Sequence, residues 1–317
     1  MSSTRQARVR ALAKINLDLR VLGKRPDGFH ELRTVFQTIS LADTLEIAYT
    51  PAPKTTITLA DPLRIADNLV VRAARLAMEA MRATGRIEMR LTKRIPMGAG
   101  LGGGSSDAAA VLLALPALVG RALAGRAGDL PKLCAIAEQL GSDVPFFLLG
   151  GTAVGIGRGS ELFPLPDAPP QRGILVAPGI HVNTAQAYRD LSPRLTTELQ
   201  QNKIFSFQSV TWDTGSLASA RNDYESVVFE QHRKLAILKK RLVRAGATVA
   251  LMTGSGSALF GLFPDCNGIF RATEVLGKVQ TFPFSLVSRA RSRALWRRAL
   301  KEHTTPGLWP LQSRYSG

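Results

Sequence analysis

The sequence is poor in cysteine and histidine. Its 317 residues include 2 cysteines and 4 histidines. Cys134 and Cys266 have no CxxC partner and no nearby histidine, and no two histidines have the i,i+4 spacing of a helical metal site. These absences argue against a disulfide scaffold and a resident zinc ion, and we expect both thiols to be free.

The sequence also lacks a long uninterrupted apolar segment. The most apolar stretch, VLLALPALVG over 111–120, is too short to cross a bilayer and contains Pro116. The N-terminal MSSTRQARVRALAKIN has basic residues but no apolar core of a signal peptide. We therefore expect a cytoplasmic protein with no membrane partner.

Acidic residues are scarce, with 24 Asp and Glu against 41 Lys and Arg and a net charge of +17. Such an excess fits a nucleic-acid partner, an anionic small substrate or a generally basic proteome. The basic residues are spread along the chain, with local enrichment over 289–301, and there is no RNP1 motif, zinc-finger spacing or aromatic–basic interleaving. We expect no specific nucleic-acid partner, and a basic nucleic-acid-binding protein stays the alternative from a different class.

Hydrophobic periodicity predicts a mixture of strands and helices. The predicted strands cover 9–23, 32–40, 43–50, 55–60, 87–95 and 173–179, with a strand–loop–strand over 248–263. The predicted helices cover 68–84, 105–118, 129–141, 183–191 and parts of 222–246, with a short helical turn and a strand over 143–159. Asp67 or Asn68 is the expected cap of the first helix. Because strands and helices do not alternate regularly, the fold class is α+β.

A segment rich in proline and glycine, 155–171, separates two units and is interpreted as a linker or boundary loop. We therefore predict an N-terminal domain over 1–165, a C-terminal domain over 166–300 and a basic tail over 301–317, for which disorder is the expectation.

The stretch PMGAGLGGGSSDAAA, Pro96–Ala110, runs from a predicted strand into a predicted helix. Its glycines let backbone N–H groups approach a ligand, and a helix N-terminus favours an anion, so the loop predicts a phosphate site. It satisfies G-x-G-x-x-G, but no acidic residue follows about 20 positions on, as a dinucleotide-binding turn requires. It ends in Gly-Ser-Ser without the lysine of a P-loop, and VAIK, HRD and DFG elements of a protein kinase are absent. A purely structural turn is the remaining alternative.

This loop resembles the second motif of the GHMP kinase superfamily, P-x-G-x-G-L-(G)-S-S-A-A. Three further segments resemble the superfamily in the expected order: ALAKINLDLRVLGKRPDGFHELRTVFQTISLADTLEI, GSDVPFFLLGGTAVGIGRGSEL and LMTGSGSALFGLF. The resemblance covers about residues 10–300. It implies a two-domain GHMP kinase fold, with an N-terminal ribosomal-protein-S5-domain-2-like ATP-binding domain and a C-terminal ferredoxin-like domain.

The subfamily form of these segments implies transfer of the ATP γ-phosphoryl group to the 2-hydroxyl of 4-diphosphocytidyl-2-C-methyl-D-erythritol, a step towards isoprenoid precursors by the non-mevalonate route. The alternative within the superfamily is a kinase for mevalonate, homoserine or a sugar. The partner is then a small cytidyl diphosphate molecule, and the cosubstrates are ATP and Mg²⁺, for which no protein ligand can be assigned. We expect a monomer or a weak homodimer.

By the same resemblance, Asp143 is the base that accepts the hydroxyl proton, and Lys14 keeps Asp143 ionised and stabilises charge in the transition state. Taken alone, Lys14 could be a strand lysine that reaches solvent, and Asp143 could be a helix cap. The loop Thr253–Ser257 is expected to close over the nucleotide and substrate. The expected ATP-binding residues are Pro96, Met97, Gly98, Ala99, Gly100, Leu101, Gly102, Gly103, Gly104, Ser105 and Ser106, with a serine hydroxyl directed at a phosphate or Mg²⁺.

Cytosine has a flat face and a hydrogen-bonding edge, and Phe29-His30 offers a ring and a donor or acceptor. The subfamily usually has Tyr-His here, so Phe29 retains the stacking surface without the hydroxyl. Tyr188 is expected to stack on the opposite face, and a core residue on an amphipathic helix is the alternative for it. Asn16 and Thr184 complete the expected substrate contacts.

Overall fold

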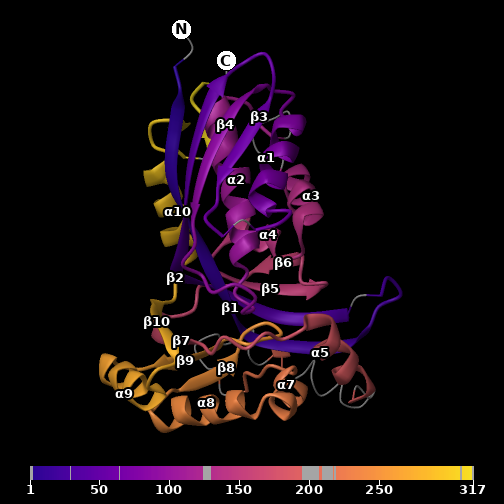
Figure 1. Cartoon of the computed structure of the whole chain (residues 1–317), viewed down its shortest axis with the longest axis vertical. Helices are drawn as coiled ribbons and strands as arrows, with labels where there is room; N and C mark the ends of the chain where they lie inside the picture. The colour runs from indigo at the N-terminus through magenta and orange to yellow at the C-terminus, as the bar shows by residue number, and fades with distance from the viewer. Residues whose placement is uncertain are drawn as a thin grey trace.

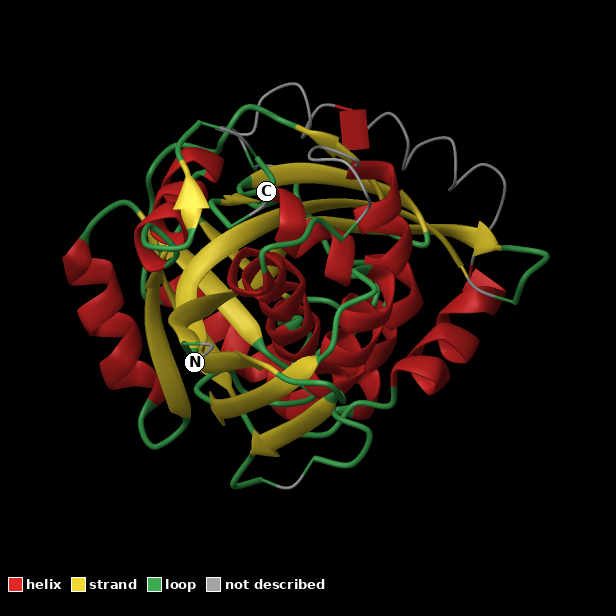
Figure 2. Cartoon of the chain, turned by 90° about the horizontal axis from the view of Figure 1, so that it is seen from above, coloured by secondary structure: helices red, strands yellow, loops and turns green. Residues whose placement is uncertain are grey.

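The computed structural model describes residues 3–28, 30–63, 65–123, 130–194, 207–208, 217, 219–307 and 309–315. Two sheets dominate these residues, and Figure 1 shows the larger one in the upper part of the molecule and the smaller one below it. Viewed from above in Figure 2, the long strands curve around the helices. The α+β class predicted from the sequence is confirmed.

The larger sheet belongs mainly to the N-terminal half. Its order is β3-β4-β2-β5-β6, with β1 paired antiparallel to β2. The strands are β1 (Arg5–Lys24), β2 (His30–Pro51), β3 (Thr56–Ala60), β4 (Gly85–Thr92), β5 (Thr152–Gly157) and β6 (Glu161–Pro164).

Helices cover one face of this sheet, as Figure 1 shows. They are α1 (Leu69–Ala80), α2 (Gly103–Val119), α3 (Leu130–Leu140) and α4 (Val144–Leu149). The side chain of Asn68 accepts a hydrogen bond from the Val70 N–H, which confirms the predicted cap of α1. Helix α2 is buried from Ser106 to Leu118, as its almost continuous apolar sequence demands.

The sequence predicted two strands over 32–40 and 43–50, but β2 is one strand of 22 residues. Its first half pairs with β5 and its second half with β4, while β1 follows both halves. The interruption in the sequence pattern at Leu41–Asp43 therefore marks the point where β2 changes its pairing strand from β5 to β4. A register shift between Leu12 and Lys14 in β1 accommodates it.

The first half of the predicted linker is also wrong. Residues 152–164 form the hairpin β5–β6, in which Ala153 pairs with Pro164. The strand predicted before residue 159 corresponds to β5, whereas β6 was missed because glycines and prolines surround its four residues. Pro164 is compatible with a strand here because it ends an edge strand, where a missing N–H costs little.

The smaller sheet is antiparallel in the order β10-β7-β9-β8. This order, with helices between β7 and β8 and between β9 and β10, is the ferredoxin-like arrangement. The strands are β7 (Arg172–Ala177), β8 (Val249–Met252), β9 (Leu259–Phe263) and β10 (Gln280–Ser285). The helices on it are α5 (Thr184–Leu191), α7 (Glu225–Gln231), α8 (Arg233–Arg244) and α9 (Cys266–Leu276), with a 3-10 turn η1 (Ser192–Arg194) after α5.

The last helix, α10 (Arg289–Ala299), returns to the larger sheet, where Trp296 and Leu300 join its core. Beyond it, β11 (Thr304–Thr305) pairs with β12 (Gln312–Ser313), and the Trp309 indole donates to the Leu148 carbonyl. The disorder expected for 301–317 is therefore wrong for the residues described there. The difference arises because Trp309 and Leu311 pack, partly buried, against the core of the larger sheet.

Candidate active site

Side chains from both sheets line one cavity of about 650 Å³, a size typical of small-molecule sites. Nine of the residues singled out in the sequence lie in its wall, although they are far apart along the chain. They are Lys14, Asn16, His30, Gly98, Gly100, Gly102, Asp143, Thr184 and Tyr188.

Lys14 lies in the middle of β1 and is only 4% exposed. Its Nζ is 3.6 Å from Oδ2 of Asp143 and donates a hydrogen bond of 2.9 Å to Oδ1 of Asn16. Lys14 is therefore not a strand lysine that reaches solvent. Asp143 precedes α4, but its side chain makes no capping hydrogen bond and so does not act as a helix cap. It lines the cavity instead.

Asn16 connects β1 to the loop after β8. Its Oδ1 accepts from the Gly254 N–H at 2.9 Å, and its Nδ2 donates to Thr34 Oγ1 at 2.7 Å. The backbone N–H of Asn16 donates to Thr253 Oγ1 at 3.1 Å. Asn16 thus holds Lys14 and Gly254 at fixed positions, in addition to lining the cavity.

The two glycine-rich loops lie in direct contact. Gly100 has φ of +78°, and a Cβ there would lie 2.2 Å from the Thr253 carbonyl oxygen, so only glycine fits. The Lys14 N–H donates to the Leu101 carbonyl at 3.1 Å, which ties the first loop to β1. The strand that carries Lys14 therefore also positions the loop predicted to bind phosphate.

The residues of the predicted phosphate loop differ in where they point. Ala99 and Leu101 are buried in a core cluster, whereas Met97 is 60% exposed. The hydroxyl of Ser106 donates to the Leu12 carbonyl at 2.7 Å inside the protein. This bond ties α2 to β1, so of the two loop serines expected to reach a phosphate or Mg²⁺, Ser105 and Ser106, Ser106 has its hydroxyl engaged inside the protein.

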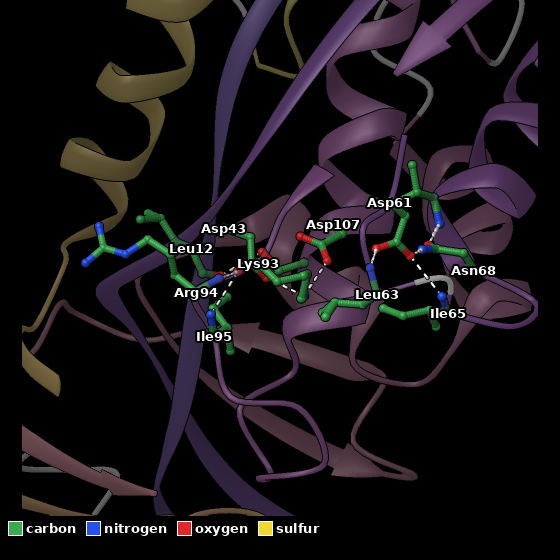
Figure 3. A network of polar contacts seen from close by, with 12 residues as sticks. Leu12, Asp43, Asp61, Leu63, Ile65, Asn68, Lys93, Arg94, Ile95 and Asp107 are labelled. Carbon is green, nitrogen blue, oxygen red and sulfur yellow. Dashed lines mark hydrogen bonds and ion pairs between the residues drawn. The ribbon is translucent and has the colours of Figure 1, made fainter. Parts of the chain in front are cut away.

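A buried ionic network lies under the start of this loop (Figure 3). Lys93 Nζ donates to Asp107 at 2.7 Å and to Asp43, and Asp43 Oδ1 accepts from the N–H groups of Arg94 and Ile95. Burial raises the pKa of Asp107 to about 7, against the opposing charge of Lys93. The network fixes the point at which β4 leads into the loop.

An aromatic wall forms another side of the cavity. The His30 ring stacks on the Tyr188 ring with centroids 4.1 Å apart and an angle of 16°. Tyr224 meets Tyr188 edge to face, with centroids 5.0 Å apart. Burial, and next the charge of Lys24, lowers the pKa of His30, which favours the neutral form of its ring. Phe29 lies outside the described residues.

Sequence reasoning missed the segment before α7 that holds the second glycine loop. Asn222 Nδ2 donates to the carbonyl oxygens of Met252 and Gly254, both at 2.7 Å, and the Met252 N–H donates to Glu225 at 2.8 Å. Arg158 and His181, also missed, line the cavity. The polar run RNDYE at the start of a predicted helix was the available signal.

The GHMP kinases N terminal domain matches residues 68–151, and the GHMP kinases C terminal domain matches residues 213–275. The 4-diphosphocytidyl-2-C-methyl-D-erythritol kinase of Solibacter usitatus is 77% identical over 320 aligned residues that span the whole of both chains. The chain belongs to the 4-diphosphocytidyl-2-C-methyl-D-erythritol kinase family of GHMP kinases.

Solved structures agree with this membership. A crystal structure of 4-(cytidine 5'-diphospho)-2C-methyl-D-erythritol kinase is 36% identical, with a TM-score of 0.73, and covers 88% of this chain and 98% of its own. A homoserine kinase from Cytophaga hutchinsonii has a TM-score of 0.67 at 18% identity, covering 89% of this chain and 95% of its own, which shows a shared fold alone. The GHMP kinase fold predicted from the sequence is confirmed. In the described part of the chain, no helix has the length and apolarity needed to span a membrane.

Proposed function

We propose that this chain transfers the γ-phosphoryl group of ATP to the 2-hydroxyl of 4-diphosphocytidyl-2-C-methyl-D-erythritol, giving the 2-phosphate and ADP in the non-mevalonate route to isoprenoid precursors. The observation that carries the proposal is the contact between Lys14 and Asp143 in a cavity that two glycine loops and an aromatic wall also line. The glycine loops suit the phosphates of a phosphoryl donor, the carboxylate of Asp143 suits a proton acceptor, and the aromatic wall suits a pyrimidine base.

Asp143 is the general base. The acceptor oxygen forms a bond to the γ-phosphorus while the bridging oxygen leaves with ADP, and the hydroxyl proton passes to Asp143. The Asp143 side chain is 36% exposed, which leaves it accessible to a hydroxyl in the cavity. Among the described residues that line the cavity, Asp143 is the acidic one.

Lys14 stabilises negative charge next to this base. Its ammonium group lies between Asn16 and Asp143, and its burial strengthens the interaction with any phosphoryl oxygen that enters the cavity. The hydrogen bond to Asn16 fixes the ammonium group in advance, so little reorganisation is needed when charge develops.

Backbone N–H groups between Gly98 and Ser106, at the start of α2, cradle the ATP phosphates, and Ser105 is the loop hydroxyl left to assist them. No group of three or more His, Cys, Asp and Glu side chains is placed to hold a metal among the described residues. The donors present therefore fit Mg²⁺ that arrives on the ATP phosphates, where it would neutralise phosphate charge.

His30 and Tyr188 bind the cytosine end of the acceptor, since both aromatic rings line the cavity, where they stack on one another. Thr184 shares a hydrogen bond of 2.7 Å with Ser255 and so links α5 to the second glycine loop. We propose that Thr184 and Asn16 contact the acceptor between its base and the reacting hydroxyl. The predicted cytoplasmic location, the absence of nucleic-acid and membrane partners, and the monomer or weak homodimer remain predictions.

A coupled ADP-release assay tests the function directly. We expect ADP release with 4-diphosphocytidyl-2-C-methyl-D-erythritol, dependent on Mg²⁺, and a much lower rate with mevalonate, homoserine or galactose. Release no faster than in the absence of an acceptor would overturn the proposal, and a faster rate with one of the other alcohols would assign the chain a different acceptor.

A further inference from the structure

Two polar atoms in the aromatic wall have no hydrogen-bond partner among the described residues. They are Nε2 of His30 and the hydroxyl of Tyr224, and their two rings contact the same ring, Tyr188. A buried polar group without a partner costs about 1–3 kcal/mol, so its retention needs an explanation. His30 already belongs to the proposed cytosine site, whereas Tyr224 has no role in the proposed reaction.

Tyr224 is held rigidly in this wall. It is 1% exposed, and its N–H donates to Asn222 Oδ1 at 3.0 Å immediately before α7 begins. Its ring packs edge to face on Tyr188 at 87°, and it lines the same cavity as Lys14 and Asp143. The side chain is therefore preorganised and would lose little conformational entropy on binding a ligand.

The Tyr224 hydroxyl keeps its proton and can therefore donate a hydrogen bond. Burial, followed by the neighbouring Tyr188 hydroxyl, raises the pKa of Tyr224 well above its ordinary value. The two phenol groups lie close enough to influence one another, but the Tyr224 hydroxyl has no hydrogen-bond partner among the described residues. A group beside Tyr188 that offers an acceptor atom would satisfy it.

We propose that Tyr224 is a specificity-determining residue whose hydroxyl donates a hydrogen bond to the edge of the pyrimidine base that packs against Tyr188. The pyrimidine edge carries a carbonyl oxygen and a ring nitrogen, either of which can accept this bond. The inference rests on the proposed function, since it takes the acceptor to be a cytidyl diphosphate. It adds a third side chain to the base-binding residues His30 and Tyr188.

The test is Tyr224→Phe, with Tyr49→Phe as the matched control. The Tyr49 hydroxyl is also in a buried residue, but it donates to the Thr84 carbonyl at 3.0 Å and lies away from the cavity. Loss of a satisfied hydrogen bond lowers stability, whereas loss of an unpartnered hydroxyl leaves stability unchanged or raises it. Tyr49→Phe should therefore lower Tm and leave the KM for the acceptor unchanged. Tyr224→Phe should keep or raise Tm and should raise the KM for the acceptor.

For Tyr224→Phe we expect the KM for the acceptor and the Kd for CDP, measured by calorimetry on the full chain, to rise together by about three- to tenfold. The KM for ATP should not change, and Tm should equal or exceed that of the unmodified protein. A lower Tm with unchanged acceptor KM would show that the hydroxyl is structural and overturn the inference. A rise in acceptor KM without a rise in the Kd for CDP would overturn the assignment to the base.

Failure of the proposed function is recognised separately. If the unmodified protein releases no ADP with the cytidyl acceptor, the proposed function fails, whatever the variants do. The ratio of CDP affinities between Tyr224→Phe and the unmodified protein still decides the role of Tyr224, because it requires no turnover. An unchanged ratio would overturn that role even in a fully active kinase.

Discussion

Nζ of Lys14 lies 3.6 Å from Oδ2 of Asp143, although the two residues are 129 positions apart in the chain (143 − 14). Lys14 comes from the middle of the longest strand pair, and Asp143 comes from the turn between α3 and α4. The pair therefore forms only when the helical layer packs on the sheet. The chemistry proposed for the cavity therefore requires a correctly packed N-terminal domain.

Asp143→Asn should abolish most turnover, because the amide cannot accept the hydroxyl proton. We expect kcat to fall by about 10²–10⁴-fold, while binding of ATP, measured by calorimetry, persists. Glu274→Gln, which removes an exposed carboxylate on α9, is the charge-matched control and should keep normal kcat. Near-normal activity of Asp143→Asn would exclude Asp143 as the base.

His30→Ala should weaken binding of the cytidyl acceptor far more than binding of ATP. The variant loses the ring that stacks at 4.1 Å on Tyr188, and we expect the acceptor KM to rise by about tenfold on the scale of one aromatic contact. Steady-state kinetics with each substrate varied in turn would measure both KM values. An equal rise in both would rule out a role confined to the cytidyl end.

The sequence drew attention to Lys14, Asp143 and the glycine-rich loop, whose roles in catalysis and phosphate binding are proposals, because each lies within a contiguous motif. AKIN placed Lys14 and Asn16 in a strand, and the Gly-rich run before Ser105 marked a strand-to-helix turn. The local pattern also predicted the cap at Asn68, because a capping side chain bonds to an N–H group only two or three residues further along the same helix. These features depend on neighbours within a few positions, which is the range over which pattern is informative.

What the sequence could not provide depends on distant contacts. The role of Asn222 becomes visible only when the fold places it beside the carbonyl groups of Met252 and Gly254. In the same way, the structural role of Ser106 is shown only by its hydrogen bond to Leu12. The continuity of β2 similarly depends on β1 pairing along its whole length. Such partners are set by tertiary packing, which overrides local propensity.

Asn222→Ala should loosen the second glycine loop. The change removes the donor to the carbonyls of Met252 and Gly254 and the acceptor for Tyr224, which should lower the free energy of unfolding by about 1–3 kcal/mol. Hydrogen exchange should quicken locally at the amides of 253–256. Asn267→Ala, an exposed position on α9, serves as the control and should leave exchange unchanged. Unaltered protection of the loop in Asn222→Ala would refute this role.

Asp107→Asn should change how stability depends on pH. Burial raises the pKa of Asp107 to about 7 from an ordinary value of 3.8, so the folded protein holds this proton over a range in which the unfolded chain has lost it. The folded state then binds more protons between about pH 4 and 7, and this carboxyl lowers the free energy of unfolding progressively as pH rises through that window.

The asparagine variant carries no titrating proton at this position. The difference in unfolding free energy between Asp107→Asn and the unmodified protein should therefore increase in favour of the variant from about pH 4 to 7, by on the order of 4 kcal/mol, and level off above it. The attraction of Lys93 for the ionised carboxylate is already included in the pKa of about 7, so it adds no separate slope in this window. Urea unfolding at each pH would measure the difference, and a difference that is flat across the window would show that Asp107 titrates alike in both states.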